Sequence, residues 1–136
     1  MLINHDHLRA VVRAITTAGG STGDEPNGVA NNLVNANLTG HDSHGVGMLP
    51  RYIEAVASGQ LIPNQRLKMV SDAGAMLVVD GGAGYGQMIG EEAMKIGIER
   101  AETHGVCVLS IRQSFHLCRI GAWGEQCADA GMIRMH

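Results

Sequence analysis

The sequence predicts a mixed α/β fold, in which an N-terminal helical subdomain precedes the start of an αβ subdomain. Apolar residues recur at helical spacing before Pro63, while short β-branched runs appear only after it. Glycine-rich turns separate these later elements. We place the boundary so that the helical subdomain covers residues 1–65 and the αβ subdomain covers 66–136.

Three helices are expected in the first subdomain. The first begins at Asn4 or Asp6 and ends at the glycines at 19 and 20, which are a typical stop signal. The second covers 24–40 and carries a proline in its first turn, where the missing N–H group costs nothing. The third runs from about residue 47 to 58, and each of the three has an apolar face.

The second subdomain is expected to alternate strands and helices. Strands are predicted at 67–71 and 75–80 with a hairpin turn between them, and a buried strand at 106–111. Helices are predicted from the glycine-rich turn at 81–86 to Gly105, and at 121–130. Residues 132–136 resemble the start of another strand, so we expect the chain to be the N-terminal part of a longer protein.

The glycine-rich turn at 81–86 lies between a strand and a helix, as a dinucleotide-binding loop does. Its spacing is different, because a motif that starts at Gly82 and Gly84 would need glycine at Gln87. The neighbouring units also look antiparallel and not βαβ. We therefore predict a structural turn and a fold that is not a Rossmann fold.

Composition excludes several classes of partner. The chain has 10 basic and 13 acidic residues, no basic tract and only 3% aromatic residues, which argues against nucleic acid. No apolar run approaches the ~20 residues that cross a membrane, and no signal-peptide core is visible. The three cysteines have no paired spacing, which favours a reducing, cytoplasmic location.

Residues 40–52 hold two histidines, an aspartate, a serine and an arginine in a short segment with several glycines. Histidine titrates near neutrality, so this segment suits proton transfer. His41 and His44 could instead bind a metal, with His116 as a third ligand of a metal-dependent hydrolase. A further interpretation is that His41 caps the C-terminal end of the preceding helix.

A second candidate segment, 113–121, joins the predicted buried strand to the last helix. Ligands of α/β proteins bind at such strand ends, and a helix N-terminus offers N–H groups to a phosphate. Arg119 would add a positive charge there. A purely structural histidine at His116 is the alternative interpretation.

Together, these segments resemble the malate/L-lactate dehydrogenase family of type 2, which is distinct from the Rossmann-fold lactate and malate dehydrogenases. The matching motifs lie at 42–46, 50–52 and 114–123. The likeness extends over essentially the whole chain. Within the family it is greatest to the hydroxycarboxylate dehydrogenase B type.

The resemblance implies a largely antiparallel sheet and a cytoplasmic homodimer that uses NAD or NADP. The reaction would be reduction of a small 2-oxo acid, or the reverse oxidation of a 2-hydroxy acid. Carried over by position, His44 is the proton donor to the substrate carbonyl oxygen, and Ser43 belongs to a relay that orients it. The residues that would contact the cofactor are His116, Leu117, Cys118, Arg119 and Ile120.

Two positions depart from the family pattern. Met48 stands where many members have an arginine that binds the substrate carboxylate, so Arg51 or Arg119 would have to replace it. Cys118 stands where a small residue such as glycine is expected. The acidic partner of the relay would lie beyond residue 136, so we expect the chain to be inactive by itself. The remaining alternative is a structural module that needs a missing half.

Overall fold

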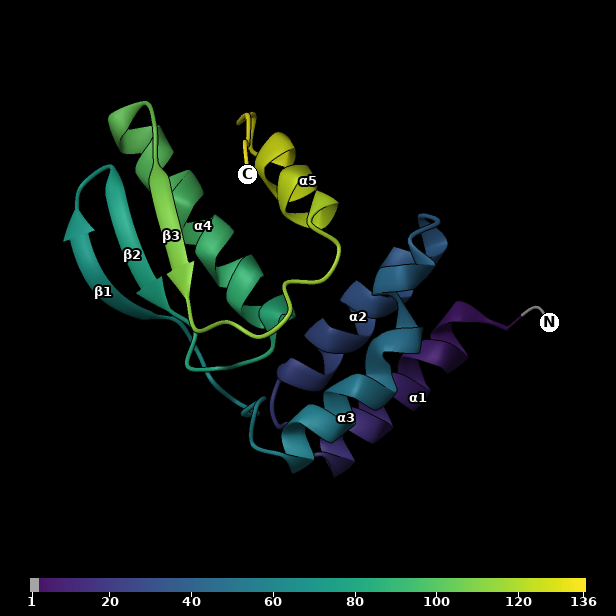
Figure 1. The fold of residues 1–136 in the computed structure, drawn as a ribbon. Helices are drawn as coiled ribbons and strands as arrows, with labels where there is room; N and C mark the ends of the chain where they lie inside the picture. Colours follow the sequence, from purple (N-terminus) through teal and green to yellow (C-terminus); the bar gives the residue numbers. More distant parts are fainter. Residues whose placement is uncertain (1–2) are drawn as a thin grey trace.

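A computed structural model describes residues 3–136 and shows helices followed by a small sheet with two helices. The elements are α1 (His5–Ala18), α2 (Glu25–Leu38), the 3-10 turns η1 (Asp42–His44) and η2 (Val46–Met48), α3 (Leu49–Ala57), β1 (Lys68–Ala73), β2 (Met76–Asp80), α4 (Gly86–His104), β3 (Val108–Arg112) and α5 (Gly121–Asp129). Helices α1–α3 lie together on one side of the molecule. The sheet lies on the other side, together with α4 and α5 (Figure 1). The predicted mixed α/β class is confirmed.

Local sequence signals set the helix ends. The Asn4 side chain accepts hydrogen bonds from the backbone N–H groups of Asp6 and His7, at 2.8 and 3.2 Å, and so caps α1. Helix α4 ends at Gly105, whose φ of +78° is in the left-handed region that glycine adopts without strain. The third helix starts two residues later than predicted, because residues 46–48 form the turn η2.

The sheet has the strand order β1-β2-β3. Strands β1 and β2 form the predicted antiparallel hairpin, while β2 and β3 run parallel. The expectation that no βαβ unit surrounds the glycine-rich turn was therefore wrong. Helix α4 returns the chain along one face of the sheet, which is what a parallel crossover requires (Figure 1). In residues 3–136 the sheet thus has one antiparallel and one parallel pair.

Two predictions for the C-terminal part were also wrong. Strand β3 was expected to be buried, but its residues alternate between exposed and half-buried. Residues 132–136 were expected to begin a strand, but they are irregular. They are held instead by a hydrogen bond from the Met132 N–H to the Cys127 carbonyl, and by another from Arg134 to the Ile120 carbonyl.

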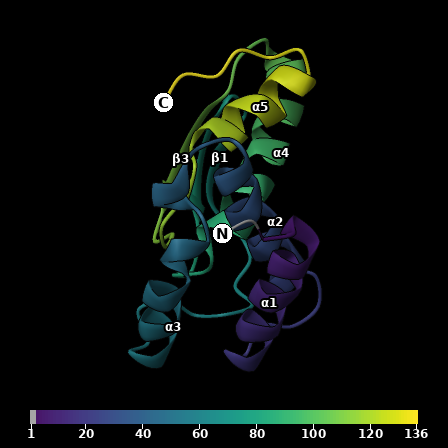
Figure 2. The same ribbon diagram turned by 90° about the vertical axis from the view of Figure 1, so that its right-hand side faces the viewer.

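One apolar core connects the helices α1–α3 to the start of α4 and to the loop after β3. Its buried members are Val12, Val29, Ala30, Leu33, Leu49, Tyr52, Ala55, Leu61, Tyr85, Met88 and Cys118. Figure 2 shows the two ends that this core joins, with α1 and α3 at one end and α4 and α5 at the other. The boundary between residues 65 and 66 stays a prediction.

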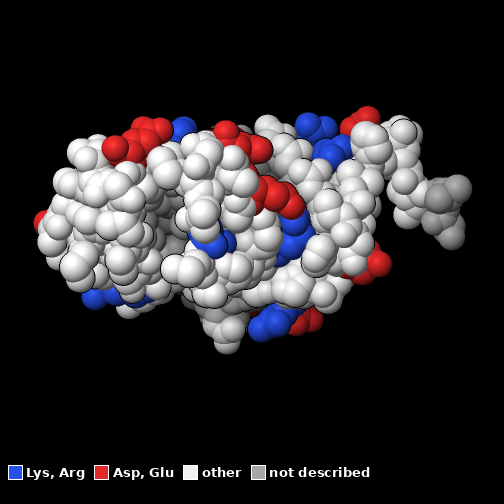
Figure 3. Space-filling view, turned by 90° about the horizontal axis from the view of Figure 1, so that it is seen from above, with Lys and Arg blue, Asp and Glu red and all other residues white. Residues whose placement is uncertain are grey.

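Charged side chains are not segregated by sign on the face of the molecule that Figure 3 draws. On the face drawn in Figure 3, basic and acidic side chains are interspersed and form no continuous basic patch. Within residues 3–136, every helix is too short or too polar to span a bilayer.

Candidate active site

Two consecutive 3-10 turns, η1 and η2, present Ser43 and His44. Asn37 of α2 holds both turns, since its amide nitrogen donates to the Asp42 carboxylate and its amide oxygen accepts from the Val46 N–H at 2.9 Å. The chain must pass close to Asn37 between these contacts. A Cβ atom on Gly45 would lie 2.3 Å from the Asn37 amide oxygen, so only glycine fits there without a shift.

The loop after β3 brings His116 against His44. The two imidazole rings are stacked with their centroids 5.4 Å apart and their planes inclined by 26°. Both rings are half-buried. The sequence analysis brought His116 near His44 only in the metal interpretation. The stacking of the two rings was not predicted, because the two residues lie far apart in the chain.

Each of the two rings has a hydroxyl group at its Nδ1 atom. Ser43 Oγ lies 2.9 Å from His44 Nδ1, and the Tyr52 hydroxyl lies 3.0 Å from His116 Nδ1. Neither Nε2 atom has a hydrogen-bond partner within residues 3–136. The contact between Ser43 and His44 is the geometry that a relay needs, while the role of either residue stays a prediction.

Burial lowers the pKa of His116, and the nearby charges of His44 and Arg51 lower it further. His116 therefore favours the neutral form at neutral pH.

A buried polar cluster lies behind His116. The Tyr52 hydroxyl is 2.9 Å from Cys118 Sγ, and Gln87 Nε2 is 3.1 Å from that hydroxyl and 3.0 Å from the sulfur. Tyr52 is completely buried. Burial, with a smaller contribution from Cys118, raises the pKa of Tyr52 far above its usual value, so the phenol keeps its proton.

The predicted cofactor loop divides into two kinds of residue. His116, Leu117 and Ile120 are half-buried, whereas the Cys118 and Arg119 side chains are buried. The positive charge predicted at Arg119 is paired within the protein, and a role of Arg119 at a phosphate stays a prediction. Its guanidinium donates two hydrogen bonds, of 2.7 and 2.6 Å, to the Glu125 carboxylate.

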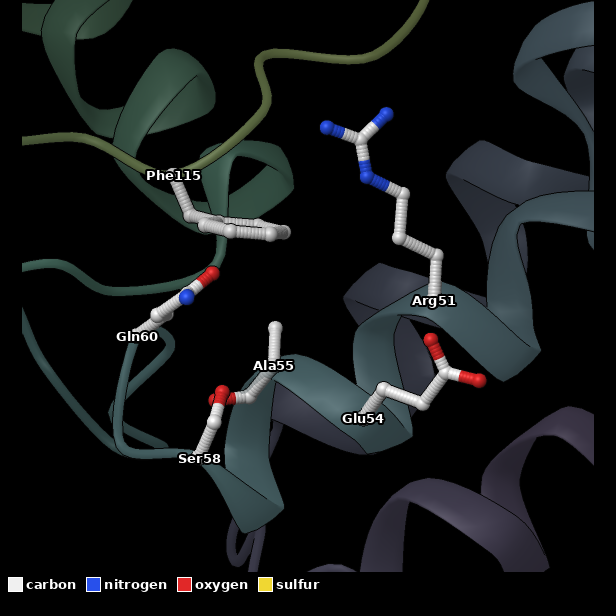
Figure 4. Close-up of a pocket in the computed structure, with 6 residues that line it drawn as sticks. All are labelled: Arg51, Glu54, Ala55, Ser58, Gln60 and Phe115. Carbon is white, nitrogen blue, oxygen red and sulfur yellow. The ribbon is translucent and has the colours of Figure 1, made fainter.

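Arg51 is the basic residue that faces open space beside the histidines. It projects from α3 and lines a cavity of about 360 Å³ together with Phe115. In Figure 4 the two side chains stand on either side of this cavity. In the described part of the chain Arg51 forms no ion pair. Met48, which takes the position of the family arginine, packs instead against the apolar core.

The glycine-rich turn at 81–86 is tied down by the protein itself. The four N–H groups from Gly81 to Gly84 donate in turn to the Arg112 carbonyl, the Asp80 carboxylate, the Gln113 carbonyl and the Gly81 carbonyl. These donors are therefore not available to a phosphate. The predicted structural role of this turn is confirmed.

Within residues 3–136, no group of three or more His, Cys, Asp or Glu side chains lies close enough to hold a metal ion. The structure therefore gives no support to the metal interpretation of His41, His44 and His116. His41 is oriented toward the end of α2. Its Nδ1 atom lies 2.9 Å from the Thr39 carbonyl oxygen, which confirms the predicted helix-end position.

The family follows from a comparison with known proteins. A family model described as malate/L-lactate dehydrogenase matches residues 3–136. The chain belongs to this family. It is 43% identical over 129 residues to hydroxycarboxylate dehydrogenase B of Escherichia coli strain K12, and 38% identical over 133 residues to an L-lactate dehydrogenase of Cupriavidus necator.

A solved family structure agrees with the fold. The malate dehydrogenase of Pyrococcus horikoshii OT3 superimposes with a TM-score of 0.91 at 29% identity, over 96% of this chain and 38% of that one. The E. coli and C. necator relatives are matched over 95% and 98% of this chain, but over only 36% and 38% of their own length. This chain therefore spans little more than a third of its relatives.

Proposed function

We propose that this chain supplies the acid–base side of the active site of an NAD(P)-dependent 2-hydroxyacid dehydrogenase. The observation that carries the proposal is the stacked pair His44–His116, in which each Nδ1 is held by a hydroxyl and each Nε2 is free of protein partners in residues 3–136. The names of the relatives support it, since they include hydroxycarboxylate, lactate and malate dehydrogenases.

His44 is the proposed proton donor in the direction of 2-oxo acid reduction. When bound, NADH or NADPH supplies the hydride that reaches the carbonyl carbon. Negative charge then develops on the substrate oxygen, and an imidazolium at His44 stabilises and protonates that oxygen through Nε2. Ser43, at Nδ1, fixes the orientation of the ring. In the direction of oxidation, neutral His44 accepts the proton.

The loop of residues 116–120 is the proposed contact for the cofactor. It lies directly beside His44, and His116, Leu117 and Ile120 keep partly exposed side chains that can line a nicotinamide site. Cys118 and Arg119 face the protein interior, so they would contribute through the backbone and through the shape of the loop.

Arg51 is the proposed anchor for the substrate carboxylate. A guanidinium binds a carboxylate with charge-assisted hydrogen bonds, and Arg51 is free of an ion-pair partner among residues 3–136. Arg119, the other candidate, is occupied by Glu125. A homodimer and a cytoplasmic location belong to the same proposal. Activity would require the polypeptide that corresponds to the rest of the relatives' length.

The test is to replace His44 with alanine in the natural polypeptide that carries this chain. General acid–base catalysis contributes about 10²–10⁴-fold, so we expect 2-oxo-acid-dependent oxidation of NADH or NADPH to fall by that amount while the nucleotide still binds. His41→Ala is the matched control, because it removes a neighbouring imidazole whose hydrogen bonds within residues 3–136 are all to Thr39, at the end of α2. Equal turnover by the His44→Ala variant and the parent protein would refute the assignment.

A further inference from the structure

The buried polar cluster behind His116 determines where that ring carries its proton. We propose that Tyr52 is a positioning residue that holds neutral His116 with its proton on Nε2, and that Gln87 and Cys118 aim the Tyr52 hydroxyl. The catalytic consequence rests on the proposed function, while the tautomer itself does not.

The argument begins with the available hydrogens. The Gln87 amide nitrogen can only donate, and it lies 3.1 Å from the Tyr52 oxygen and 3.0 Å from Cys118 Sγ. With the amide in this orientation, which leaves Gln87 Oε1 buried without a hydrogen-bond partner among residues 3–136, both of those atoms accept from Gln87. The single Tyr52 proton then has two possible acceptors, His116 Nδ1 at 3.0 Å and Cys118 Sγ at 2.9 Å.

His116 Nδ1 is the better acceptor of the Tyr52 proton. Sulfur is a weak acceptor, and Cys118 already accepts from Gln87, whereas an imidazole nitrogen is a strong acceptor. The thiol can direct its own proton to the His44 carbonyl oxygen at 3.9 Å. The Tyr52 proton thus goes to His116 Nδ1, and a neutral His116 has to carry its own proton on Nε2.

Burial makes this arrangement rigid. Tyr52, Gln87 and Cys118 are 0%, 2% and 1% exposed, so water cannot replace a missing partner. Three separate elements supply them, since Tyr52 comes from α3, Gln87 from α4 and Cys118 from the loop after β3. Cys118 has a φ of +57°, a left-handed conformation that cysteine rarely adopts and that accompanies its inward position here.

The charges around His116 favour the neutral ring on which the proposal depends. His44 is stacked on one side at 5.4 Å, and Arg51 is the nearby cation from α3. With Nδ1 closed by Tyr52, the neutral ring presents a fixed N–H donor beside His44. The site then offers one group that exchanges a proton, His44, and one that donates a hydrogen bond.

The test is the nitrogen NMR spectrum of histidine in the natural polypeptide that carries this chain. In the parent protein at neutral pH, we expect the His116 Nδ1 signal of an unprotonated nitrogen and the Nε2 signal of a protonated one. Tyr52→Phe removes only the hydroxyl and keeps the edge-on ring contacts to Tyr85 and Phe115. Both His116 signals should then move toward the average of the two tautomers.

Tyr85→Phe is the matched control, because it removes a nearby buried hydroxyl that has no contact with His116 within residues 3–136. It should leave the His116 signals in place. A parent protein with its proton on Nδ1, or a Tyr52→Phe variant with unchanged signals, would overturn the proposal.

Kinetics give a second readout. For Tyr52→Phe we expect kcat to fall about tenfold, a part of the roughly 10²–10⁴-fold that acid–base catalysis contributes, with the KM of the nucleotide unchanged. A variant that keeps the parent kcat would contradict a positioning role. A protein that shows no dehydrogenase activity at all would instead refute the proposed function, and the NMR experiment would still decide the tautomer.

Discussion

Replacing Gly86 with alanine would show how firmly the start of α4 supports the histidine pair. Gly86 is the first residue of α4, and a Cβ atom there would lie 2.1 Å from the backbone carbonyl oxygen of His116. Contacts of real Cβ atoms are essentially never shorter than 3.0 Å. The His116 carbonyl and the helix therefore have to move apart by about 1 Å, because a packed interior has no room to absorb the added atom.

Two opposing effects set the size of the change. Alanine is more stable than glycine inside a helix by about 0.5–1 kcal/mol, while overpacking a filled site costs about 1–3 kcal/mol. The obstructing atom at Gly86 belongs to the backbone, so the upper part of that cost applies. We expect a net loss of about 2 kcal/mol in the free energy of unfolding, which lowers Tm by roughly 8 °C in a chain of this size.

Gly124→Ala is the matched control, because an added Cβ at this helical position of α5 meets no atom within 4 Å. It should stabilise the protein by about 0.5–1 kcal/mol. Thermal and urea denaturation of both variants measures the difference. In the natural polypeptide that carries this chain, turnover should also fall about 10²-fold in Gly86→Ala, since a displacement of about 1 Å is enough to misplace His116. A Gly86→Ala variant that is as stable as the Gly124→Ala variant would refute the expected clash with the His116 carbonyl.

Three further variants test other contacts. Asn37→Ala removes the side chain that holds η1 and η2, so amide hydrogen exchange should speed up in both turns while α2 stays protected. Glu125→Gln tests the ion pair with Arg119, which keeps the pKa of Glu125 below its usual value. The ion pair should stabilise the folded protein at neutral pH. This stabilisation should be lost as the pH falls below about 4.3 toward the lowered pKa of Glu125. On acidification, the Tm of Glu125→Gln should therefore fall less than the Tm of the parent protein. Arg51→Met should raise the KM of the 2-oxo acid roughly 10- to 100-fold without changing that of the nucleotide, and adding Met48→Arg should restore part of the loss; an unchanged KM would exclude Arg51 as the anchor.

Local signals allowed much of the helical structure to be predicted. A capping side chain at Asn4 and a left-handed glycine at Gly105 act on the residues next to them, so the sequence shows them directly. The parallel pairing of β3 was missed because pairing depends on the path of the whole connection. The length of that connection was the available signal, since α4 has 19 residues, enough for a parallel crossover.

The candidate site was only partly visible in the sequence. Ser43 and His44 are neighbours in the chain, so their contact could be anticipated. The stacking of His116 on His44 depends on how α3, α4 and the loop after β3 pack together, and no local pattern encodes it. The ion pair of Arg119 with Glu125 was not predicted, because Glu125 lies across the junction between a loop and a helix.

The apolar core described above has a consequence for which residues near the histidine pair can be substituted independently of stability. Tyr52 and Cys118 belong both to that core and to the polar group behind His116, so a substitution at either would disturb stability and chemistry together. Arg51 lies at the rim of a cavity and does not belong to the core, whereas Phe115 lines the same cavity and packs against the core. Substitutions of Arg51 should therefore cost less stability than substitutions of Tyr52 or Cys118.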